Sequence, residues 1–307
     1  MINDMKRAVI TGATGAIGTA LINELISNGV EVLVVTRRES KRNGVLPAHP
    51  LVKVVYCPLE EIASLEGDGS GYDVFYHFAW SGTTGKARND MYLQNLNVRY
   101  ALDAVKAAKA LGCRTFIGAG SQAEYGRTEE RMTPQTPVFP ETGYGMAKLC
   151  AGQMTRALAH SLGLRHIWTR VLSVYGENDG ESSMVSSTVK KLKSGGRPVF
   201  TSGEQSWDYL YSGDAARAFY LLGEKGIDGK TYVVASGNDM PLRNYIEILR
   251  DVVSPGAELG FGEYKTETEP LGIRADISEL TLDTGFAPSV DFAEGIRRIS
   301  EKFDSEQ

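Results

Sequence analysis

The run Ala8-Val-Ile-Thr-Gly12-Ala-Thr-Gly15-Ala-Ile-Gly18 decides the fold of this chain. It leads from a β-branched segment, Arg7–Thr11, through three glycines into a helix-like segment, Gly15–Ser27. The first glycine permits a tight turn, the second lets a ligand approach the backbone, and the third lets helix and strand pack closely. The run therefore predicts a dinucleotide-binding unit in which the free N–H groups of the helix N-terminus face phosphates.

The segments that follow predict a parallel sheet covered by helices. Short β-branched or aromatic segments alternate with longer helical ones such as Met91–Leu111, where apolar residues recur every three or four positions. The strand candidates are Arg7–Thr11, Glu31–Thr36, Val52–Tyr56, Val74–Phe78, Thr115–Ala119 and His166–Val171. We therefore expect an α/β protein, with a Rossmann-type doubly wound parallel sheet and a smaller mixed α/β C-terminal domain that binds substrate.

The expected domain division follows the change in segment length. Residues 1–172 form the dinucleotide-binding domain, and residues 173–307, with shorter and more Gly-rich segments, form mainly the substrate-binding domain. Segments at about 207–236 are expected to return and pack on the Rossmann core.

Composition excludes several classes of function. The chain has 307 residues, 42% of them hydrophobic and 23% charged, and a net charge of −5, so it has the core of a globular protein and no basic surface for nucleic acid or anionic membrane. Its three cysteines, Cys57, Cys113 and Cys150, are far apart, so we expect no disulfide framework, no metal site and a reducing cytoplasm. No apolar stretch approaches the roughly 18 residues that span a bilayer, and we expect no leader before the first strand. The expected partner is a small molecule.

The end of the second strand indicates which dinucleotide binds. NAD-binding proteins usually carry an acidic residue there for the ribose 2′-hydroxyl, whereas this chain has Arg37 and Arg38. Guanidinium groups suit a 2′-phosphate, so NADP(H) is favoured and NAD(H) remains possible. The alternative is that both arginines only solvate the strand end, with Glu39 pairing one of them.

A second group of residues suggests proton transfer. Tyr144 and Lys148 lie four residues apart, on one face of a predicted helix that follows the proline-rich loop Arg131–Thr142. A nearby cation favours the phenolate of a tyrosine, which is how a tyrosine becomes an acid or base at neutral pH. Ser121 follows the strand Thr115–Ala119, at the end where doubly wound sheets carry their functional groups.

Together these residues resemble the extended short-chain dehydrogenase/reductase family over nearly the full length of the chain. The matching motifs are the glycine run from Gly12, His77-Phe78-Ala79, Asn97, Tyr125-Gly126, Arg170-x-x-x-Val174-Tyr175-Gly176, Asp208-Tyr209 and Arg274-x-Asp276. The resemblance implies hydride transfer between a nicotinamide and a sugar carbon, usually C4 of a nucleotide-linked hexose. Tyr144 would exchange the proton on the reacting oxygen, Lys148 would lower the pKa of Tyr144 and hold the nicotinamide ribose, and Ser121 would hydrogen-bond that oxygen.

The resemblance also implies the binding residues. The expected cofactor contacts are Gly12, Thr14, Gly15, Ala16, Ile17, Gly18, Arg37, Arg38, Leu59, Phe78, Ala79, Asn97, Tyr144 and Lys148. The expected substrate contacts are Ser121, Gln122, Ser173, Trp207 and Arg274, where Trp207 replaces a family arginine and Arg274 stands at a pyrophosphate-binding position. Asn97 could instead be a packing amide, and Trp207 could be a core residue.

Departures from the family pattern select among its reactions. Family 4,6-dehydratases carry an Asp-Glu pair where this chain has Gln122 and Ala123, and Glu124 comes one position too late, so dehydration is disfavoured. The arginine pair, and Pro58 in place of an aspartate common in NAD-binding relatives, favour an NADPH-dependent reductase of a nucleotide-linked 4-keto-(6-deoxy)hexose. The alternative is an NAD-dependent nucleotide-sugar 4-epimerase. A non-enzymatic NADP(H)-sensing regulator fits the intact Ser121, Tyr144 and Lys148 less well.

A homodimer is a further expectation. By family habit, two copies would associate through the helices Met91–Leu111 and Gly143–Leu162, with Met154, Leu158 and Leu162 among the apolar residues of that face.

Overall fold

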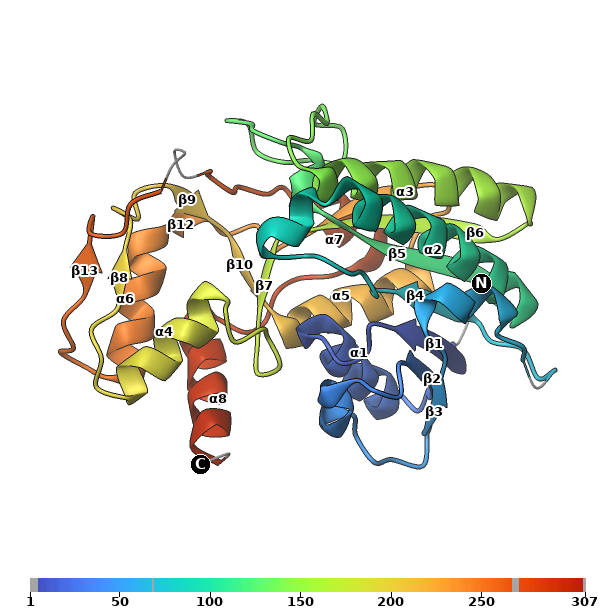
Figure 1. Ribbon diagram of the computed structural model, residues 1–307, viewed down its shortest axis with the longest axis horizontal. Coiled ribbons are helices and arrows are strands. Elements are labelled where there is room, and N and C mark those ends of the chain that lie inside the picture. The colour runs from blue at the N-terminus through green and yellow to red at the C-terminus, as the bar shows by residue number, and fades with distance from the viewer. Residues whose placement is uncertain (1–4, 68, 267–270, 306–307) are drawn as a thin grey trace.

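The computed structural model of the chain describes residues 5–67, 69–266 and 271–305, so the expectation about the N-terminal end falls outside the described residues (Figure 1). Its centre is a seven-stranded parallel sheet in the order β11-β6-β5-β4-β1-β2-β3. The strands are β1 (Arg7–Thr11), β2 (Glu31–Thr36), β3 (Val52–Tyr56), β4 (Val74–His77), β5 (Thr115–Ser121), β6 (Arg165–Val171) and β11 (Thr231–Val234). The predicted fold class is confirmed.

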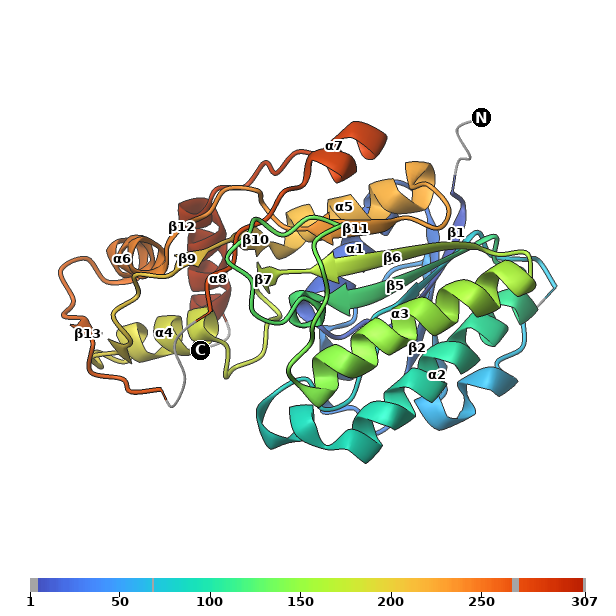
Figure 2. The same cartoon turned by 90° about the horizontal axis from the view of Figure 1, so that it is seen from above.

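Helices cover both faces of this sheet (Figure 2). One face carries α1 (Ala16–Ser27) and α5 (Ser212–Lys225), and the other carries α2 (Met91–Ala110) and α3 (Gly143–Ser161). Successive side chains of a strand point to opposite faces, so Ala8 and Ile10 join the core under α1 and α5 while Val9 joins the core under α2. This two-sided burial explains why strands β1 and β2 are nearly continuous apolar runs.

One strand boundary and one whole strand differ from the sequence prediction. Strand β5 continues past Ala119 to Ser121, because Gly120 and Ser121 still pair with Arg170 and Val171 of β6. Ser121 is therefore the last residue of a strand rather than part of the loop after it. The seventh strand, β11, was not among the expected strands, although it lies within the segment expected to return to the core.

Short 3₁₀ helices connect several of these elements. They are η1 (Lys41–Val45), η2 (Leu59–Ser64), η3 (Gly85–Asn89) and η4 (Gln122–Glu124). The loop Arg131–Thr142 contains no helix, as its prolines require, and its Met132 bridges Ala275.

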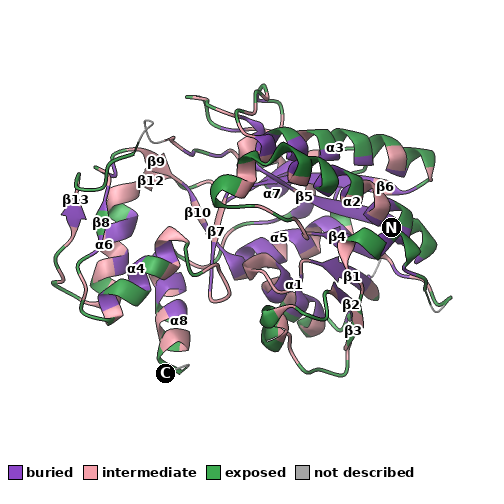
Figure 3. Cartoon of the chain, in the orientation of Figure 1, coloured by how far each residue is buried: buried purple, intermediate pink, exposed green. Residues whose placement is uncertain are grey.

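Most of the C-terminal elements gather beside the carboxyl ends of the sheet strands (Figure 1). They are β7 (Ser173–Tyr175), α4 (Met184–Lys193), β8 (Val199–Phe200), β9 (Ser206–Trp207), β10 (Tyr209–Tyr211), β12 (Met240–Pro241), α6 (Leu242–Val253), β13 (Gly260–Phe261) and α8 (Phe292–Ser305). The short helix α7 (Ser278–Thr284) packs instead against α5 and β11. Tyr175, Tyr245 and Phe292 lie in a separate buried cluster under α4, α6 and α8. Figure 3 shows that the buried residues concentrate in the sheet, while green exposed residues line the outer sides of α2 and α3. The expected domain boundary at residues 172 and 173 stays a prediction.

Candidate active site

A cleft of about 620 Å³ opens at the carboxyl ends of the strands, where the fold class places its ligands. Most residues predicted from sequence to act together do line it: Gly12, Gly15, Ala16, Ile17, Gly18, Phe78, Ser121, Tyr144, Lys148, Ser173 and Trp207. Others predicted as contacts do not line it: Thr14, Arg37, Arg38, Leu59, Ala79, Asn97, Gln122 and Arg274. The structure thus brings the glycine turn and the three expected catalytic residues to one cleft.

The glycine turn shows which glycines the protein itself requires. Gly12 has a φ of +71°, and a Cβ there would lie 2.6 Å from the backbone of Phe78 and Ala79. A Cβ at Gly18 would lie 2.4 Å from the Gly12 carbonyl oxygen. At Gly15, by contrast, a Cβ would meet nothing closer than 3.6 Å, so protein packing does not explain that glycine. An open position on the cleft wall is what a pyrophosphate lying on the backbone needs.

The N-terminus of α1 is equally suited to an anion. Gly15 is its N-cap and provides no side-chain hydrogen bond, and the first turn carries no acidic residue. The unpaired N–H groups of this turn therefore face the cleft with a partial positive charge. These residues fit the diphosphate of a dinucleotide.

Arg37 and Arg38 lie just beyond the end of β2 and are exposed. The Arg38 guanidinium stacks over the ring of Tyr56 at 4.4 Å, and the Asn43 amide donates to the carbonyl oxygen of Arg37 at 2.9 Å. Within the described residues neither arginine forms an ion pair, so the alternative pairing with Glu39 is wrong. Both guanidinium groups remain available to an outside anion.

Ser121, Tyr144 and Lys148 converge from β5 and α3. The N-cap of α3, Thr142, accepts a hydrogen bond from Gly145, which fixes the start of the helix and sets Tyr144 and Lys148 on one face. Ser121 is 9% exposed and Lys148 is 4% exposed. The Ser121 hydroxyl hydrogen-bonds the phenol of Tyr144 and accepts from the backbone N–H of Ala123 at 3.2 Å. Ser121 and Tyr144 are thus in direct contact, and the Lys148 ammonium of the same group lies 5.8 Å from the centroid of the Tyr144 ring.

The protonation of this group follows from its burial. Burial raises the pKa of Tyr144, and the hydrogen bond from Ser121 and the Arg88 cation only partly oppose that effect. Burial lowers the pKa of Lys148 to about 7. Without a cofactor, the tyrosine therefore carries its proton at neutral pH and is ready to act as a proton donor.

Two aromatic and cationic neighbours of the group were not predicted from the sequence. The Lys148 ammonium lies 3.8 Å from the centroid of the Trp80 ring, which stands edge-on to Tyr144 and donates to Gln94 at 2.8 Å. The guanidinium of Arg88 lies over the ring of Tyr144, with its central carbon 4.4 Å from the ring centroid. The only sequence signal for Trp80 is its place directly after the His77-Phe78-Ala79 motif.

Asn97 is a packing amide in this structure. Its side chain accepts from the backbone N–H of Ser81 and donates to the carbonyl of the same residue, both at 2.9 Å. The side chain is buried, so it fixes the loop after β4. Its expected cofactor contact stays a prediction.

Glu124 does not line the cleft, which agrees with the expectation that it comes one position too late to act in dehydration. It is completely buried, and its carboxylate accepts hydrogen bonds from Ser121 N–H at 2.9 Å, Trp168 Nε1 at 3.0 Å and Arg170 Nε at 3.0 Å. The carboxylate therefore orders the end of β5 and takes no part in the cleft. Gln122 and Ala123 precede Glu124 in the same 3₁₀ helix, η4.

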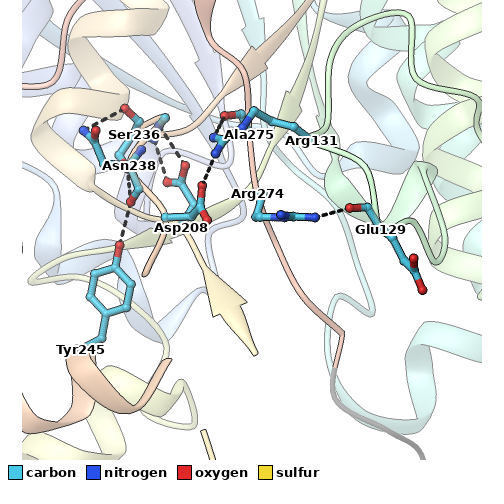
Figure 4. A network of polar contacts seen from close by, with 10 residues as sticks. Glu129, Arg131, Asp208, Ser236, Asn238, Tyr245, Arg274 and Ala275 are labelled. Carbon is cyan, nitrogen blue, oxygen red and sulfur yellow. Dashed lines mark hydrogen bonds and ion pairs between the residues drawn. The ribbon is translucent and has the colours of Figure 1, made fainter. Parts of the chain in front are cut away.

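Of the expected substrate contacts on the C-terminal side, Ser173 and Trp207 line the cleft and Arg274 does not. Figure 4 shows the Arg274 guanidinium directed to Glu129, whose carbonyl oxygen accepts from it, while Arg131 pairs with Asp239 at 2.7 Å. The expected pyrophosphate contact of Arg274 stays a prediction that would require this side chain to leave Glu129. Trp207 lies half-buried, and its Nε1 has no hydrogen-bond partner in the described structure.

The described ranges show neither a metal-binding group nor a membrane-spanning helix. No group of three or more His, Cys, Asp or Glu side chains there could hold a metal ion. The helices of the described residues include none long and apolar enough to cross a membrane.

Known proteins identify the family. The sequence pattern of the NAD dependent epimerase/dehydratase family matches residues 8–235, so the chain belongs to that family. The resemblance to extended short-chain dehydrogenases/reductases is thereby confirmed. The protein is an NAD(P)-dependent enzyme of the oxidoreductase and epimerase type.

Proteins similar to this chain include a reductase and a 4-epimerase. The dTDP-4-dehydro-6-deoxyglucose reductase of Escherichia coli is 25% identical over 305 residues, which cover 95% of this chain and 95% of that protein. The structure of UDP-N-acetylglucosamine 4-epimerase from Methanobrevibacter ruminantium M1 in complex with UDP-N-acetylmuramic acid matches with a TM-score of 0.88, 24% identity and 99% coverage of each chain. That of RMD from Pseudomonas aeruginosa complexed with NADPH matches with a TM-score of 0.80, 23% identity and coverage of 98% and 100%. These two structures establish the fold.

Proposed function

We propose that the protein is an NADPH-dependent reductase that converts the C4 carbonyl of a nucleotide-linked 4-keto-(6-deoxy)hexose to an alcohol. The observation that carries this proposal is the arginine pair after β2. Arg37 and Arg38 are exposed, have no acidic partner among the described residues and stand where a 2′-phosphate would reach the protein. A reductase must exchange its cofactor at each turnover, and NADPH is the usual donor for such reductions.

The chain's own residues supply the proton for this reaction. Tyr144 is in its protonated form at neutral pH, so it can give its phenolic proton to the C4 oxygen. Ser121 can hydrogen-bond the same oxygen, on which negative charge builds in the transition state. When bound, NADPH supplies the hydride. From the family resemblance, we propose that Lys148 holds the nicotinamide ribose.

The partner molecule is proposed to be a nucleotide-diphosphate sugar. Two of the relatives named above, the Escherichia coli reductase and the Methanobrevibacter ruminantium 4-epimerase, act on or bind such molecules. The cleft is lined by Ser173 and Trp207 in addition to the catalytic residues. Trp207 offers an aromatic face on the substrate side. We propose the cytoplasm as its compartment, because all three cysteines are free thiols.

A homodimer formed through α2 and α3 is part of the proposal. These two helices lie side by side on one face of the sheet (Figure 2). They expose Met91, Leu96, Met146 and Met154, which are 55%, 41%, 48% and 45% exposed. Of the apolar residues expected on this face, Leu158 and Leu162 pack instead against the core under α2, so Met154 alone of the three is free for an interface.

One experiment separates the candidate functions. The purified protein is incubated with NADPH and a panel of 4-keto-6-deoxy nucleotide sugars, beside UDP-hexoses with NAD, and the products are identified by mass spectrometry and NMR. The reductase proposal expects one 4-hydroxy product and equimolar loss of NADPH absorbance. Interconversion of two C4 epimers without net NADPH loss would establish the 4-epimerase instead. Absence of turnover in both panels would favour a regulator and contradict the proposal.

A further inference from the structure

Arg88 is held against the catalytic tyrosine by a contact that joins two distant segments. It lies on η3, between β4 and α2, and the centre of its guanidinium is 4.4 Å from the centroid of the Tyr144 ring. Its Nη1 donates to the carbonyl oxygen of Thr83 at 2.9 Å. The side chain also lines the cleft.

The backbone fixes this placement. The next residue, Asn89, accepts a hydrogen bond from the backbone N–H of Gly143 at 3.0 Å, at the first turn of α3. A Cβ on Gly143 would lie 2.7 Å from the sulfur of Met91 and 3.1 Å from the Arg88 carbonyl oxygen. The glycine therefore allows η3 to approach α3 closely, next to Tyr144. The arrangement is built into the fold and does not depend on a flexible side chain alone.

Arg88 is not neutralised by a carboxylate. Within the described residues it forms no ion pair, and the neighbouring Asp90 is occupied as the N-cap of α2, where it accepts from Leu93 at 3.1 Å. The guanidinium thus presents its full charge to the ring of Tyr144 and to the cleft. A cation over an aromatic face is attracted by the negative charge density of the ring. That attraction grows when the phenol becomes a phenolate, because the ring then carries more negative charge.

Arg88 is closer to the ring than the lysine usually assigned this task. Lys148 Nζ lies 5.8 Å from the ring centroid and is turned toward the carbonyl of Ala119. The other charged group that acts on the phenol is Glu124 of η4, which opposes ionisation. Burial and the charge of Lys148 lower the pKa of His77 in β4. Within the described residues, Arg88 is the cation that favours the ionised tyrosine.

We propose that Arg88 is a positioning residue for Tyr144, which orients its ring and stabilises the phenolate that remains after the proton has passed to the substrate oxygen. In that step the phenolic O–H bond breaks, the new O–H bond forms on the C4 oxygen, and the charge left on Tyr144 faces Arg88. This inference rests on the proposed function, since it takes Tyr144 as the proton donor. It adds a residue for which the sequence suggested no role.

The test is an ultraviolet titration of the Tyr144 phenol, for which no sugar substrate is required. The absorbance of each protein saturated with NADP⁺ is followed from neutral to alkaline pH, and the curve of the same protein carrying Tyr144→Phe is subtracted. Arg88→Gln is expected to raise the pKa of Tyr144 by about one unit, a roughly tenfold loss of acidity. Lys86→Gln, an exposed residue of the same 3₁₀ helix, is the matched control and is expected to leave the pKa unchanged.

Arg88→Lys extends the test, because it keeps the charge and loses the planar stack. It is expected to show a smaller rise of the pKa than Arg88→Gln, and it decides the question if the glutamine variant fails to fold. An unchanged pKa in both variants would overturn the proposal. A higher KM for the sugar with an unchanged pKa of Tyr144 would also overturn it, because Arg88 would then bind an anionic group of the substrate. If no sugar is reduced but the shift is seen, the proposed function fails and the role of Arg88 stands.

Discussion

The buried ammonium of Lys148 donates a hydrogen bond of 2.6 Å to the backbone carbonyl oxygen of Ala119 in β5. Burial destabilises the charged ammonium by more than this hydrogen bond stabilises it, because the pKa of Lys148 is lowered from 10.5 to about 7. Between these two values the unfolded chain binds a proton that the folded chain does not. The contribution of Lys148 to stability therefore rises as the pH rises from about 7 to 10.5, and it is lowest below 7.

Lys148→Met is expected to make the cofactor-free protein more stable at pH 7, by on the order of a few kcal/mol, and to flatten the rise of stability with pH. The free energy of unfolding is measured by urea titration at several pH values between 6 and 10. Lys109→Met, on the exposed side of α2, is the control and should change neither quantity. A pH dependence that survives in Lys148→Met would show that this lysine is not its source.

Tyr144→Phe is expected to lower turnover by at least about a thousandfold, because it removes the donated proton while leaving the ring in place. The affinity for NADPH should remain within a few-fold of the original, since the aromatic contacts with Trp80 and Arg88 persist. Turnover is followed by product formation and affinity by fluorescence titration. Unchanged turnover would exclude Tyr144 as the proton donor.

The double variant Arg37→Ala, Arg38→Ala is expected to weaken NADPH binding by about 30-fold or more and NADH binding by less than about threefold, because only NADPH carries the 2′-phosphate. Dissociation constants for both cofactors are measured by calorimetry. Arg99→Ala, an exposed arginine of α2 paired with Asp103, is the matched control. Equal losses for both cofactors would remove the argument for NADPH.

Glu124→Ala is expected to lower the free energy of unfolding by about 3–5 kcal/mol, because it leaves the buried Arg170 without its partner. It also leaves the N–H groups of Ser121 and Trp168 without an acceptor. Glu130→Ala, at an exposed position six residues on, should stay within about 0.5 kcal/mol of the original protein. A similar small effect at both positions in urea unfolding would contradict a structural role for Glu124.

Leu96→Glu is expected to convert the proposed dimer to a monomer, because a charge would then lie in an apolar interface on α2. Sedimentation equilibrium gives the molecular mass. Leu282→Glu, on α7 and 83% exposed, is the control and should leave the mass unchanged. An original protein that is already monomeric at micromolar concentration would refute the dimer.

The sequence predicted those structural features that depend on residues close to one another along the chain. The strand, turn and helix around Gly12 follow from three glycines within seven residues, and Tyr144 and Lys148 share a face because a helix returns every three or four positions. Ser121 reached the same cleft because all parallel strands end at one edge of the sheet.

The features that it did not predict depend on contacts between distant segments. Arg88 meets Tyr144 only because η3 packs on the start of α3 at Gly143, and no local pattern announces that contact. Glu124 and Arg170 pair because β5 and β6 are neighbours in the sheet, although the two residues are 46 positions apart. Arg274 was predicted from its motif alone to contact a pyrophosphate, whereas in the structure its side chain donates a hydrogen bond to the carbonyl oxygen of Glu129 in a loop.

Strand β11 has a consequence for any attempt to divide the protein. It is the sheet's outermost strand next to β6, yet the chain reaches it only after building β7 to β10 in the C-terminal region. A fragment that stops at residue 172 would leave the whole side of β6 with unpaired N–H and C=O groups, and such an edge promotes self-association. The nucleotide-binding half is therefore not a separable module, and its edge is closed only when synthesis has passed residue 234.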